Sequence, residues 1–235
     1  MSTETPAINH EHADVTGGWL RPAVFGAMDG LVSNFALIAG VAGGGAPRQV
    51  VILAGLAGLS AGAFSMAAGE YTSVASQAES AEAEIAKERE ELRSNPEGEM
   101  AELAAIYVER GVDPELADEV SRQIHRDPDN AVNVHAREEL GVTLEDLPSP
   151  VLAAISSFAS FAIGAIIPVM PYLLGSDALL PGIVVSLVGL FAAGAVVTRF
   201  TSRSWWFGGI RQLVLGAIAA ALTYGIGNLV GAGLG

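Results

Sequence analysis

Long apolar segments alternate with short polar ones along most of the chain. Five segments are long and apolar enough to cross a membrane, at residues 22–43, 49–70, 150–174, 179–200 and 207–232. About 20 apolar residues in an α-helix span the hydrocarbon core of a bilayer. The connections "GGGAPRQ", "GSDA" and "TSRSWW" are short, so the spans that they join should be antiparallel neighbours. The pattern predicts an all-α fold built on a five-helix transmembrane bundle.

A long polar stretch, residues 71–149, separates the second apolar segment from the third. Its first part, "ASQAESAEAEIAKEREELRS", is rich in helix formers and should continue the second span out of the membrane. Three further helices should begin at Asn95–Pro96, Asp113–Pro114 and Asp127–Pro128, and the first and last should end at Gly111 and Gly141. We therefore expect four parts, namely a polar tail (1–21), two spans (22–70), a helical insert (71–149) and three spans (150–235).

Charge is concentrated in this insert. Of the 26 acidic residues, 21 lie between Glu70 and Asp146, against seven of the 12 basic residues. The formal net charge of −14 argues against nucleic acid as a partner and is compatible with cations. The absence of cysteine excludes disulfides and thiolate metal sites. The charge distribution therefore predicts that the insert is an acidic soluble domain attached to a membrane protein.

The positions of the basic residues predict the orientation. With the N-terminus inside, eleven of the 12 basic residues are cytoplasmic and only Arg48 lies outside, as the positive-inside rule favours. Trp19, Trp205 and Trp206 then fall at the cytoplasmic interface, and the insert is cytoplasmic. Residues 1–21 lack a basic region before an apolar core, so the first apolar segment should remain as a span. Only one basic residue is Lys, and Ala and Gly are abundant, which indicates a bacterial inner (cell) membrane.

Asp29 interrupts the first apolar segment, in "FGAMDGLVSNFALIAG". An acid within a membrane costs at least ~2.5–3.5 kcal/mol on insertion scales, and a functional role is its usual explanation. A structural carboxylate with Ser33 or Asn34 as its partner is the alternative. A carboxylate in a low-dielectric environment can exchange a proton for a metal ion, which is the chemistry of proton-coupled transport.

The second apolar segment carries a ridge at steps of four residues: Ala54, Gly58, Gly62, Met66 and Glu70. The first three residues are small, so another helix can approach closely. A thioether and a carboxylate follow toward the insert. Together with Asp29 they could line a path for a divalent transition metal. Ordinary apolar packing of Met66 and a solvated position for Glu70 are the alternatives.

Paired acids recur in the insert at helical spacing. Two pairs lie three residues apart, and a His–Glu pair lies four residues apart, so each pair shares one face of its helix: Glu88 and Glu91, Glu99 and Glu102, His135 and Glu139. Packed together, these faces would form a cluster that a cation stabilises. The alternative is a set of solvated faces with ion pairs to Lys87, Arg89 and Arg93. No EF-hand loop and no ferritin-type Glu-x-x-His motif occurs.

Three stretches resemble the vacuolar iron transporter (VIT) family over nearly the whole chain from about residue 20. They are "FGAMDGLVSNFALIAGVAGG", "LAGLSAGAFSMAAGEYTSVASQAE" and "SFASFAIGAIIPVMPYLL", the last with Pro168 and Pro171. The prolines should break the third span and free backbone carbonyls for a path or a hinge. The resemblance implies five spans, a cytoplasmic metal-binding domain between spans two and three, a homodimer in the lipid bilayer, and export of Fe²⁺, often also Mn²⁺, in exchange for protons.

The resemblance also implies site residues. The translocation acid falls on Asp29 and the path methionine on Met66, and the ion path runs between the first two spans of both subunits. The cytoplasmic ligands fall on five glutamates: Glu88, Glu91, Glu99, Glu102 and Glu139. The family often has methionine near position 135, where this chain has His135, so the ranking of Fe²⁺, Mn²⁺, Zn²⁺ and Co²⁺ is open. Imidazole suits iron and zinc.

We therefore expect a proton-coupled Fe²⁺ exporter, a secondary transporter and not an enzyme, in which metal passes from the insert to Glu70, Met66 and Asp29. Metal is its substrate, and no cofactor is expected. Two other classes stay open, a membrane-bound ferroxidase and a metal-responsive membrane scaffold without transport. The missing Glu-x-x-His motif argues against the ferroxidase.

Overall fold

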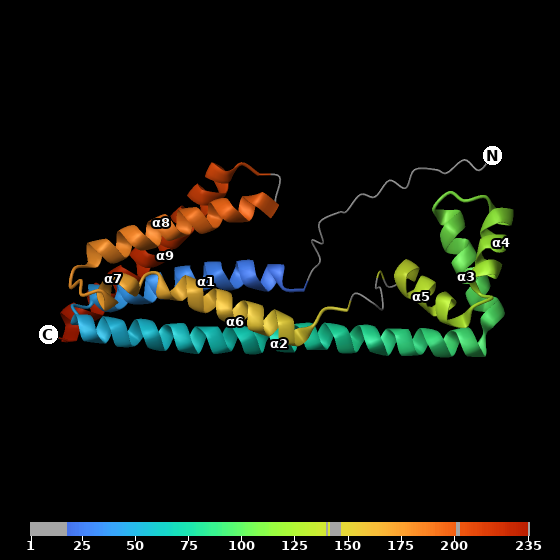
Figure 1. Cartoon of the computed structure of the whole chain (residues 1–235), viewed down its shortest axis with the longest axis horizontal. Helices are drawn as coiled ribbons and strands as arrows, with labels where there is room; N and C mark the ends of the chain where they lie inside the picture. Colours follow the sequence, from blue (N-terminus) through green and yellow to red (C-terminus); the bar gives the residue numbers. More distant parts are fainter. Residues whose placement is uncertain (1–17, 140, 142–146, 201–202, 235) are drawn as a thin grey trace, which may run out of the picture. The chain divides into compact units, whose positions relative to one another are not determined.

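The computed structural model describes residues 18–139, 141, 147–200 and 203–234, and these residues form helices and no strands (Figure 1). Most of the expected polar tail, residues 1–17, lies outside this range. Two compact units can be distinguished. We call the part up to Glu70 and from Val151 onward the membrane unit, and the part from Tyr71 to Pro150 the insert unit. The all-α prediction is thus confirmed for the described residues.

The membrane unit contains most of the apolar helices. They are α1 (Leu20–Gly43), the first part of α2 (Arg48–Ser94), α6 (Pro150–Ile166), α7 (Met170–Leu173), α8 (Leu179–Val197), a short 3₁₀ turn (Thr198–Phe200) and α9 (Trp205–Leu234). Within the described ranges, four helices are long and apolar enough to cross a membrane: α1, α2, α8 and α9. The third expected span differs, because α6 has only 17 residues and stops before Pro168. The count of five spans is therefore not confirmed.

The break after α6 has a covalent cause. Pro168 has no N–H and cannot continue the helical hydrogen-bond ladder. The amides on either side turn more tightly, because Ile167 N donates to Gly164 O and Val169 N donates to Ile166 O. The short helix α7 then restarts with Pro171 in its first turn. The predicted proline break is confirmed, and the carbonyl of Ala165 is left for another donor.

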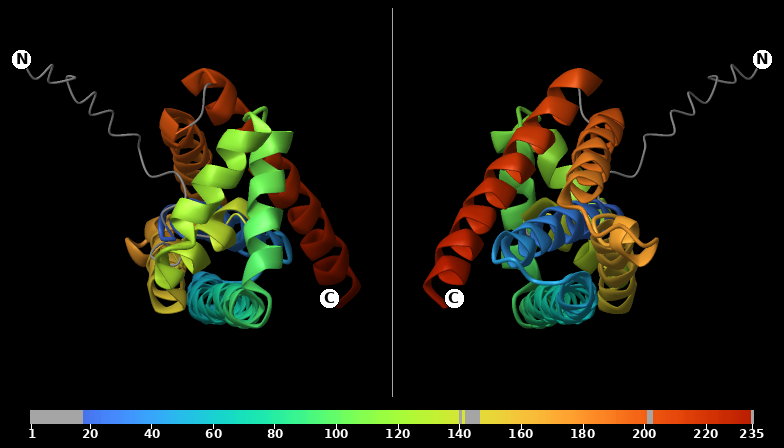
Figure 2. Two further views of the ribbon diagram at one scale, coloured as in Figure 1. Left: turned by 90° about the vertical axis from the view of Figure 1, so that its right-hand side faces the viewer. Right: turned by 90° about the vertical axis from the view of Figure 1, so that its left-hand side faces the viewer.

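Helix α1 packs against α8 and α9, as the views in Figures 1 and 2 agree. Leu31, Phe35 and Ala39, spaced by four residues, form one buried stripe on α1 that meets Leu190 of α8 and Ala220 of α9. Further along, α1 and α9 touch through glycines, since a Cβ atom built on Gly227 would collide with the backbone carbonyl of Gly40. Small residues allow this close approach of backbones.

The ridge on α2 also packs as expected. A Cβ atom built on Gly58 would meet the side chains of Leu37 and Asn34 on α1, and one on Gly62 would meet the ring of Phe161 on α6. At the other end of the unit, Ile38 of α1 and Val51 of α2 pack with Val169 and Tyr172. Helices α1, α2 and α6 therefore form a second packed group in the membrane unit.

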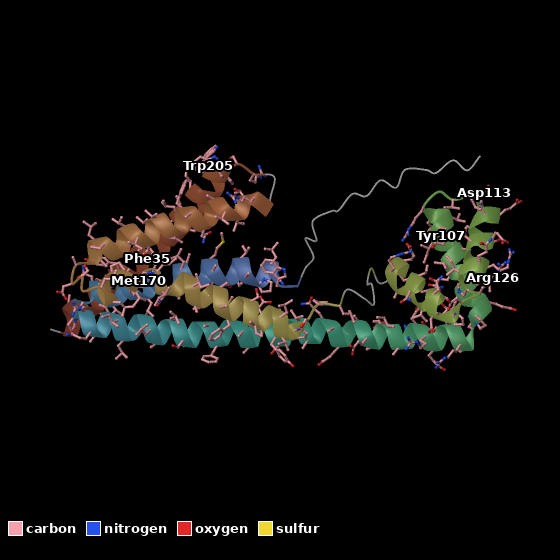
Figure 3. All side chains as sticks on the ribbon, viewed as in Figure 1. Phe35, Tyr107, Asp113, Arg126, Met170 and Trp205 are labelled. Carbon is pink, nitrogen blue, oxygen red and sulfur yellow. The ribbon has the colours of Figure 1, made fainter. Side chains whose placement is uncertain are left out.

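The insert unit contains the rest of α2 with α3 (Pro96–Glu109), α4 (Pro114–Ile124) and α5 (Pro128–Glu139). The predicted continuation of the second span is confirmed, because α2 is one helix of 47 residues. The predicted caps are confirmed as well. The side chain of Asn95 accepts from Gly98 N, and that of Asp113, labelled in Figure 3, accepts from Glu115 N. The expected end of the last helix near Gly141 adjoins residue 140, outside the described residues.

Helices α3, α4 and α5 pack against one another, as the end-on view of Figure 2 shows. The hydroxyl of Ser121 on α4 donates to the carbonyl of Met100 on α3 at 2.6 Å, which fixes the first pair. Ile85 on α2 packs with Val132 and Ala136 on α5. This small apolar contact decides which faces of α2 and α5 meet, and so which polar side chains lie next to it.

Candidate metal sites

A cluster of four acidic and imidazole side chains lies beside the apolar contact of the insert unit. Glu88 follows Ile85 by about one turn of α2, and His135 and Glu139 extend the face of Val132 and Ala136 on α5. Glu99 comes from α3. One ligand atom of each residue in the cluster lies within 4.8 Å of those of the others: Glu88, Glu99, His135 and Glu139.

His135 is at the centre of this cluster and is fully buried, with an exposed fraction of 0%. Its Nδ1 atom lies 2.7 Å from Glu139 Oε1, 2.9 Å from Glu88 Oε1 and 3.9 Å from Glu99 Oε2. A single ring nitrogen can form a hydrogen bond with at most one of these three oxygens. Glu88 Oε1 is buried without a hydrogen-bond donor among the described residues.

His125, at the C-terminal end of α4, contacts the other side of the His135 ring. Its Nδ1 atom lies 2.8 Å from the Ser121 carbonyl oxygen, and its Nε2 atom lies 3.3 Å from His135 Nε2. A carbonyl only accepts, so Nδ1 of His125 carries the proton. When His125 is neutral, its Nε2 accepts from His135 Nε2–H. The lone pair of His135 Nδ1 then faces the carboxylates, an arrangement that a cation between them would stabilise.

Burial and mutual repulsion shift the ionisation of the cluster. Burial, followed by the neighbouring carboxylates with Glu139 foremost, raises the pKa of Glu88 to about 7. Burial is also the main cause of the raised pKa values of Glu99 and Glu139. Burial, and then His125, lowers the pKa of His135. Each of these shifts disfavours the charged form, as expected of like charges gathered away from water.

A cavity of about 250 Å³ adjoins the cluster. Its lining contains every glutamate that the sequence nominated in the insert, together with Glu84 and Lys87: Glu84, Lys87, Glu88, Glu91, Glu99, Glu102 and Glu139. Glu91 and Glu102 line the cavity but are outside the four-residue cluster. Lys87 Nζ lies 3.6 Å from Glu91 Oε1, and Arg93 Nη1 lies 4.0 Å from Glu90 Oε2. Two of the three basic residues named in the alternative interpretation therefore form ion pairs. That these residues bind metal stays a prediction.

The sequence patterns did not predict two residues of this region as part of a site. Glu84 lies four residues before Glu88, so the spacing that nominated the other glutamates could have found it. His125 lies ten residues from His135 on another helix, and its role depends on how α4 packs. No local pattern signals that contact.

A second polar pocket lies in the membrane unit, between α1, α2 and α6. It has a volume of about 270 Å³ and brings together most of the polar and sulfur-bearing residues that the two first apolar segments contain. Its lining consists of Asp29, Ser33, Asn34, Leu37, Gly58, Gly62, Ser65, Met66 and Phe161. Asp29 and Met66, both nominated from the sequence, therefore share one pocket. Glu70, one turn beyond Met66, is not among the described residues that line it.

Asn34 is the most buried polar residue of this pocket, with an exposed fraction of 2%. Its amide nitrogen donates to the carbonyls of Gly55 on α2 (3.1 Å) and Ala165 on α6 (2.6 Å). The second carbonyl is the one freed by the proline break. Its side-chain oxygen, Oδ1, accepts no hydrogen bond from any residue that the structure describes.

Comparisons with known proteins agree on one family. The model of the VIT family matches residues 20–228. The chain is 43% identical to a vacuolar iron transporter of Acanthamoeba castellanii, over 95% of this chain and 84% of that protein. It is 32% identical to vacuolar iron transporter 1 of Oryza sativa subsp. japonica, over 94% and 90% of the two chains. It is 30% identical to vacuolar iron transporter 1 of Arabidopsis thaliana, over 97% and 92%.

Proposed function

Because the chain belongs to the VIT family, we propose that it exports cytosolic Fe²⁺, and also Mn²⁺, across the membrane in exchange for protons. It is a transporter and not an enzyme, as its relatives are named transporters. The apolar helices make it an integral membrane protein. The metal is its substrate.

The observation that carries the proposal is the pocket that Asp29 and Met66 share between apolar helices. A carboxylate oxygen and a thioether sulfur together suit a borderline divalent ion such as Fe²⁺ better than Mg²⁺ or Ca²⁺. A carboxylate among apolar helices is also a group that can hold either a proton or a metal ion. Alternating occupancy of Asp29 by the two is the proposed basis of coupling.

The insert cluster supports the collection of metal before transport. Three carboxylate oxygens and one imidazole nitrogen suit a first-row divalent ion, including Fe²⁺, Zn²⁺ and Co²⁺. Bonds of roughly 2.0–2.2 Å to such an ion place ligand atoms about 3–4.4 Å apart, close to the spacing within the cluster. Metal bound there would pass to Glu70 and then to the pocket of Met66 and Asp29.

The proposed orientation is supported by the distribution of basic residues, and the proposed assembly by the resemblance to the VIT family. Eleven of the 12 basic residues favour a cytoplasmic N-terminus and insert. Arg48, the exception, contacts the turn before α8, where its side chain donates to Gly175 O at 2.9 Å and lies 3.6 Å from Asp177. We propose a homodimer in a bacterial inner membrane, with the ion path between the first two spans of both subunits.

Uptake into sealed proteoliposomes tests the proposal. Fe²⁺ is added outside under anaerobic conditions, to vesicles whose lumen is either acidic or at the external pH. Protein molecules with the insert facing outward should accumulate Fe²⁺ faster when the lumen is acidic, and the lumen should lose protons as metal enters. An oxygen-dependent ferroxidase would show no such uptake, and a scaffold would show none under any condition.

Asp29→Asn should abolish this uptake, because an amide cannot exchange a proton for metal. Asp177→Asn is the matched control, since Asp177 is exposed and lies outside the pocket. Equal uptake by wild type and Asp29→Asn would contradict the assigned role of Asp29. Absence of metal uptake by the wild type at either lumen pH would overturn transport itself.

A further inference from the structure

The hydrogen-bond partners of the Asn34 side chain define which way its amide is oriented, although the two possible orientations differ little in shape. The group on one side of the amide lies against two carbonyl oxygens, those of Gly55 and Ala165. Only the NH₂ group can donate to both, and the reversed amide would set three oxygens against one another. The oxygen Oδ1 must therefore be the atom on the other side.

That oxygen is buried and accepts no hydrogen bond within the part of the chain that the structure describes. Buried carbonyl groups are nearly always hydrogen-bonded, so an unsatisfied one calls for an explanation. Asn34 lines the same pocket as Asp29 and Met66. The neighbouring position on α2 is Gly58, whose ideal Cβ would come within 2.9 Å of Oδ1. A larger residue at position 58 would therefore crowd the oxygen.

We propose that the side-chain carbonyl of Asn34 is a ligand for the transported divalent cation, alongside Asp29 and Met66. This inference rests on the proposed transport function and adds a neutral, hard oxygen to the binding set. The two hydrogen bonds of the amide nitrogen fix the orientation of Oδ1 in a residue that lines the pocket, so the same side chain would join three helices and bind the ion. Because an amide oxygen carries no proton to displace, it binds the metal without releasing one.

The hardness of the ligand gives a specific expectation. Amide oxygens favour hard ions such as Mn²⁺, whereas the Met66 thioether favours soft ions such as Cd²⁺. Removal of the carbonyl leaves a softer set. Asn34→Leu should therefore raise the apparent KM for Mn²⁺ uptake by about 10-fold, the size of change typical of a lost metal-site interaction, with a clearly smaller rise for Cd²⁺.

Two further variants separate binding from helix tethering. Asn34→Asp keeps an oxygen at this position but loses both N–H donors, so it should retain more Mn²⁺ affinity than Asn34→Leu. Thr223→Val is the matched tether control. The Thr223 hydroxyl donates from α9 to the carbonyl of Ala36 on α1 at 2.6 Å, and Thr223 is not part of the pocket lining. Its loss should leave the Mn²⁺-to-Cd²⁺ ratio unchanged.

The experiment measures uptake of each ion by proteoliposomes at several concentrations, with folding checked by thermal unfolding in detergent. A changed metal ratio in Asn34→Leu, partly restored in Asn34→Asp, supports the inference. Equal loss for both ions in both Asn34 variants would mean that Asn34 is only a tether. Unchanged KM values would mean that Oδ1 binds only water, and either result overturns the inference. Failure of the wild type to transport any ion would refute the proposed function instead.

Discussion

Glu88 is the residue whose acid–base chemistry the insert changes most. It is 5% exposed, its pKa is raised to about 7, and its Oε1 atom faces the Nδ1 atom of His135. An ordinary glutamate is charged throughout the physiological range. Glu88 is instead close to half protonated at neutral pH, so protons and metal ions compete for the same oxygen.

This competition predicts a pH dependence of metal binding. With a pKa of about 7, Glu88 is mostly protonated at pH 6 and mostly ionised at pH 8, so Mn²⁺ should bind the purified protein about 10-fold more weakly at pH 6. Glu99 and Glu139, whose pKa values are also raised, act in the same direction. Competition with a fluorescent chelator measures the affinity. Equal affinity at both pH values would contradict this role of Glu88.

Stability of the metal-free protein should change in the opposite sense. A carboxyl group whose pKa rises on folding holds more protons when folded, so the free energy of unfolding decreases as pH rises toward and through 7. His135 opposes this, because its pKa is lowered, but its effect ends above its unfolded value of 6.5. Between pH 7 and 8, hydrogen exchange in insert peptides should therefore become faster than its intrinsic pH dependence explains.

Substitution of His125 tests whether this residue orients His135 for metal binding. Its Nε2 atom is the neighbour that orients the His135 ring. His125→Phe keeps a ring but removes the acceptor, and should weaken Co²⁺ binding by about 10-fold, with a changed visible spectrum of the bound ion. His125→Gln restores an acceptor and should recover much of the affinity. Identical Co²⁺ spectra and affinities in all three proteins would show that His125 only packs.

Chemical reasoning on single residues predicted Asp29, Met66 and the insert glutamates as candidates, because charge in an apolar segment and acid pairs at helical spacing are local patterns. The same local patterns did not indicate His125, and they indicated Asn34 only as a possible partner of Asp29. The contact of His125 depends on the packing of α4, and that of Asn34 on a carbonyl 131 residues away. Such contacts have no signal in the spacing of residues.

At the scale of helices, local rules predicted where most elements begin. Asn95 and Asp113 cap their helices because each stands before a proline and offers an oxygen to the next free N–H groups. The third apolar segment was harder. Its proline break was predicted, but its hydrophobicity was read as one span of 25 residues, whereas the structure contains α6 and α7 separately. Hydropathy measures composition and is insensitive to a single missing N–H.

Helix contacts through glycine give a prediction for α9. Gly227 and Gly225 lie two residues apart, but a Cβ atom at 227 would collide with the backbone of Gly40, whereas one at 225 meets none of the described residues within 4 Å. Gly227→Ala should lower the thermal unfolding temperature in detergent. Gly225→Ala should leave it unchanged or raise it, since Ala favours a helix over Gly by about 1 kcal/mol. The same decrease in both variants would mean that this contact is not tight.

Over the entire protein, the net charge is distributed very unevenly along the chain. Residues 70–146 contain 21 acidic and seven basic residues, a net charge of −14, which equals that of the entire chain. The remaining residues are therefore neutral as a group. A strongly acidic region attracts divalent cations over distances up to the Debye length, about 10 Å at 0.1 M salt and 3 Å at 1 M.

This distribution predicts that salt slows metal capture. The association rate constant of Mn²⁺, measured by stopped-flow fluorescence, should fall by about 10-fold or more between 0.02 and 0.5 M KCl, because screening weakens long-range attraction. The dissociation rate should change much less, since the cluster itself is buried. Choline chloride is the control for specific effects of K⁺. A salt-independent association rate would show that the acidic region does not guide the ion.

The crowding of carboxylates around His135 also affects how the protein should be handled. A chelator such as EDTA removes divalent ions, and the like charges of the cluster then repel one another without a counterion. An ion that binds only the folded state stabilises it in proportion to the logarithm of its concentration. Samples for cryo-microscopy or crystallisation should therefore be more homogeneous when they are purified in chelator-free buffer with millimolar Mn²⁺.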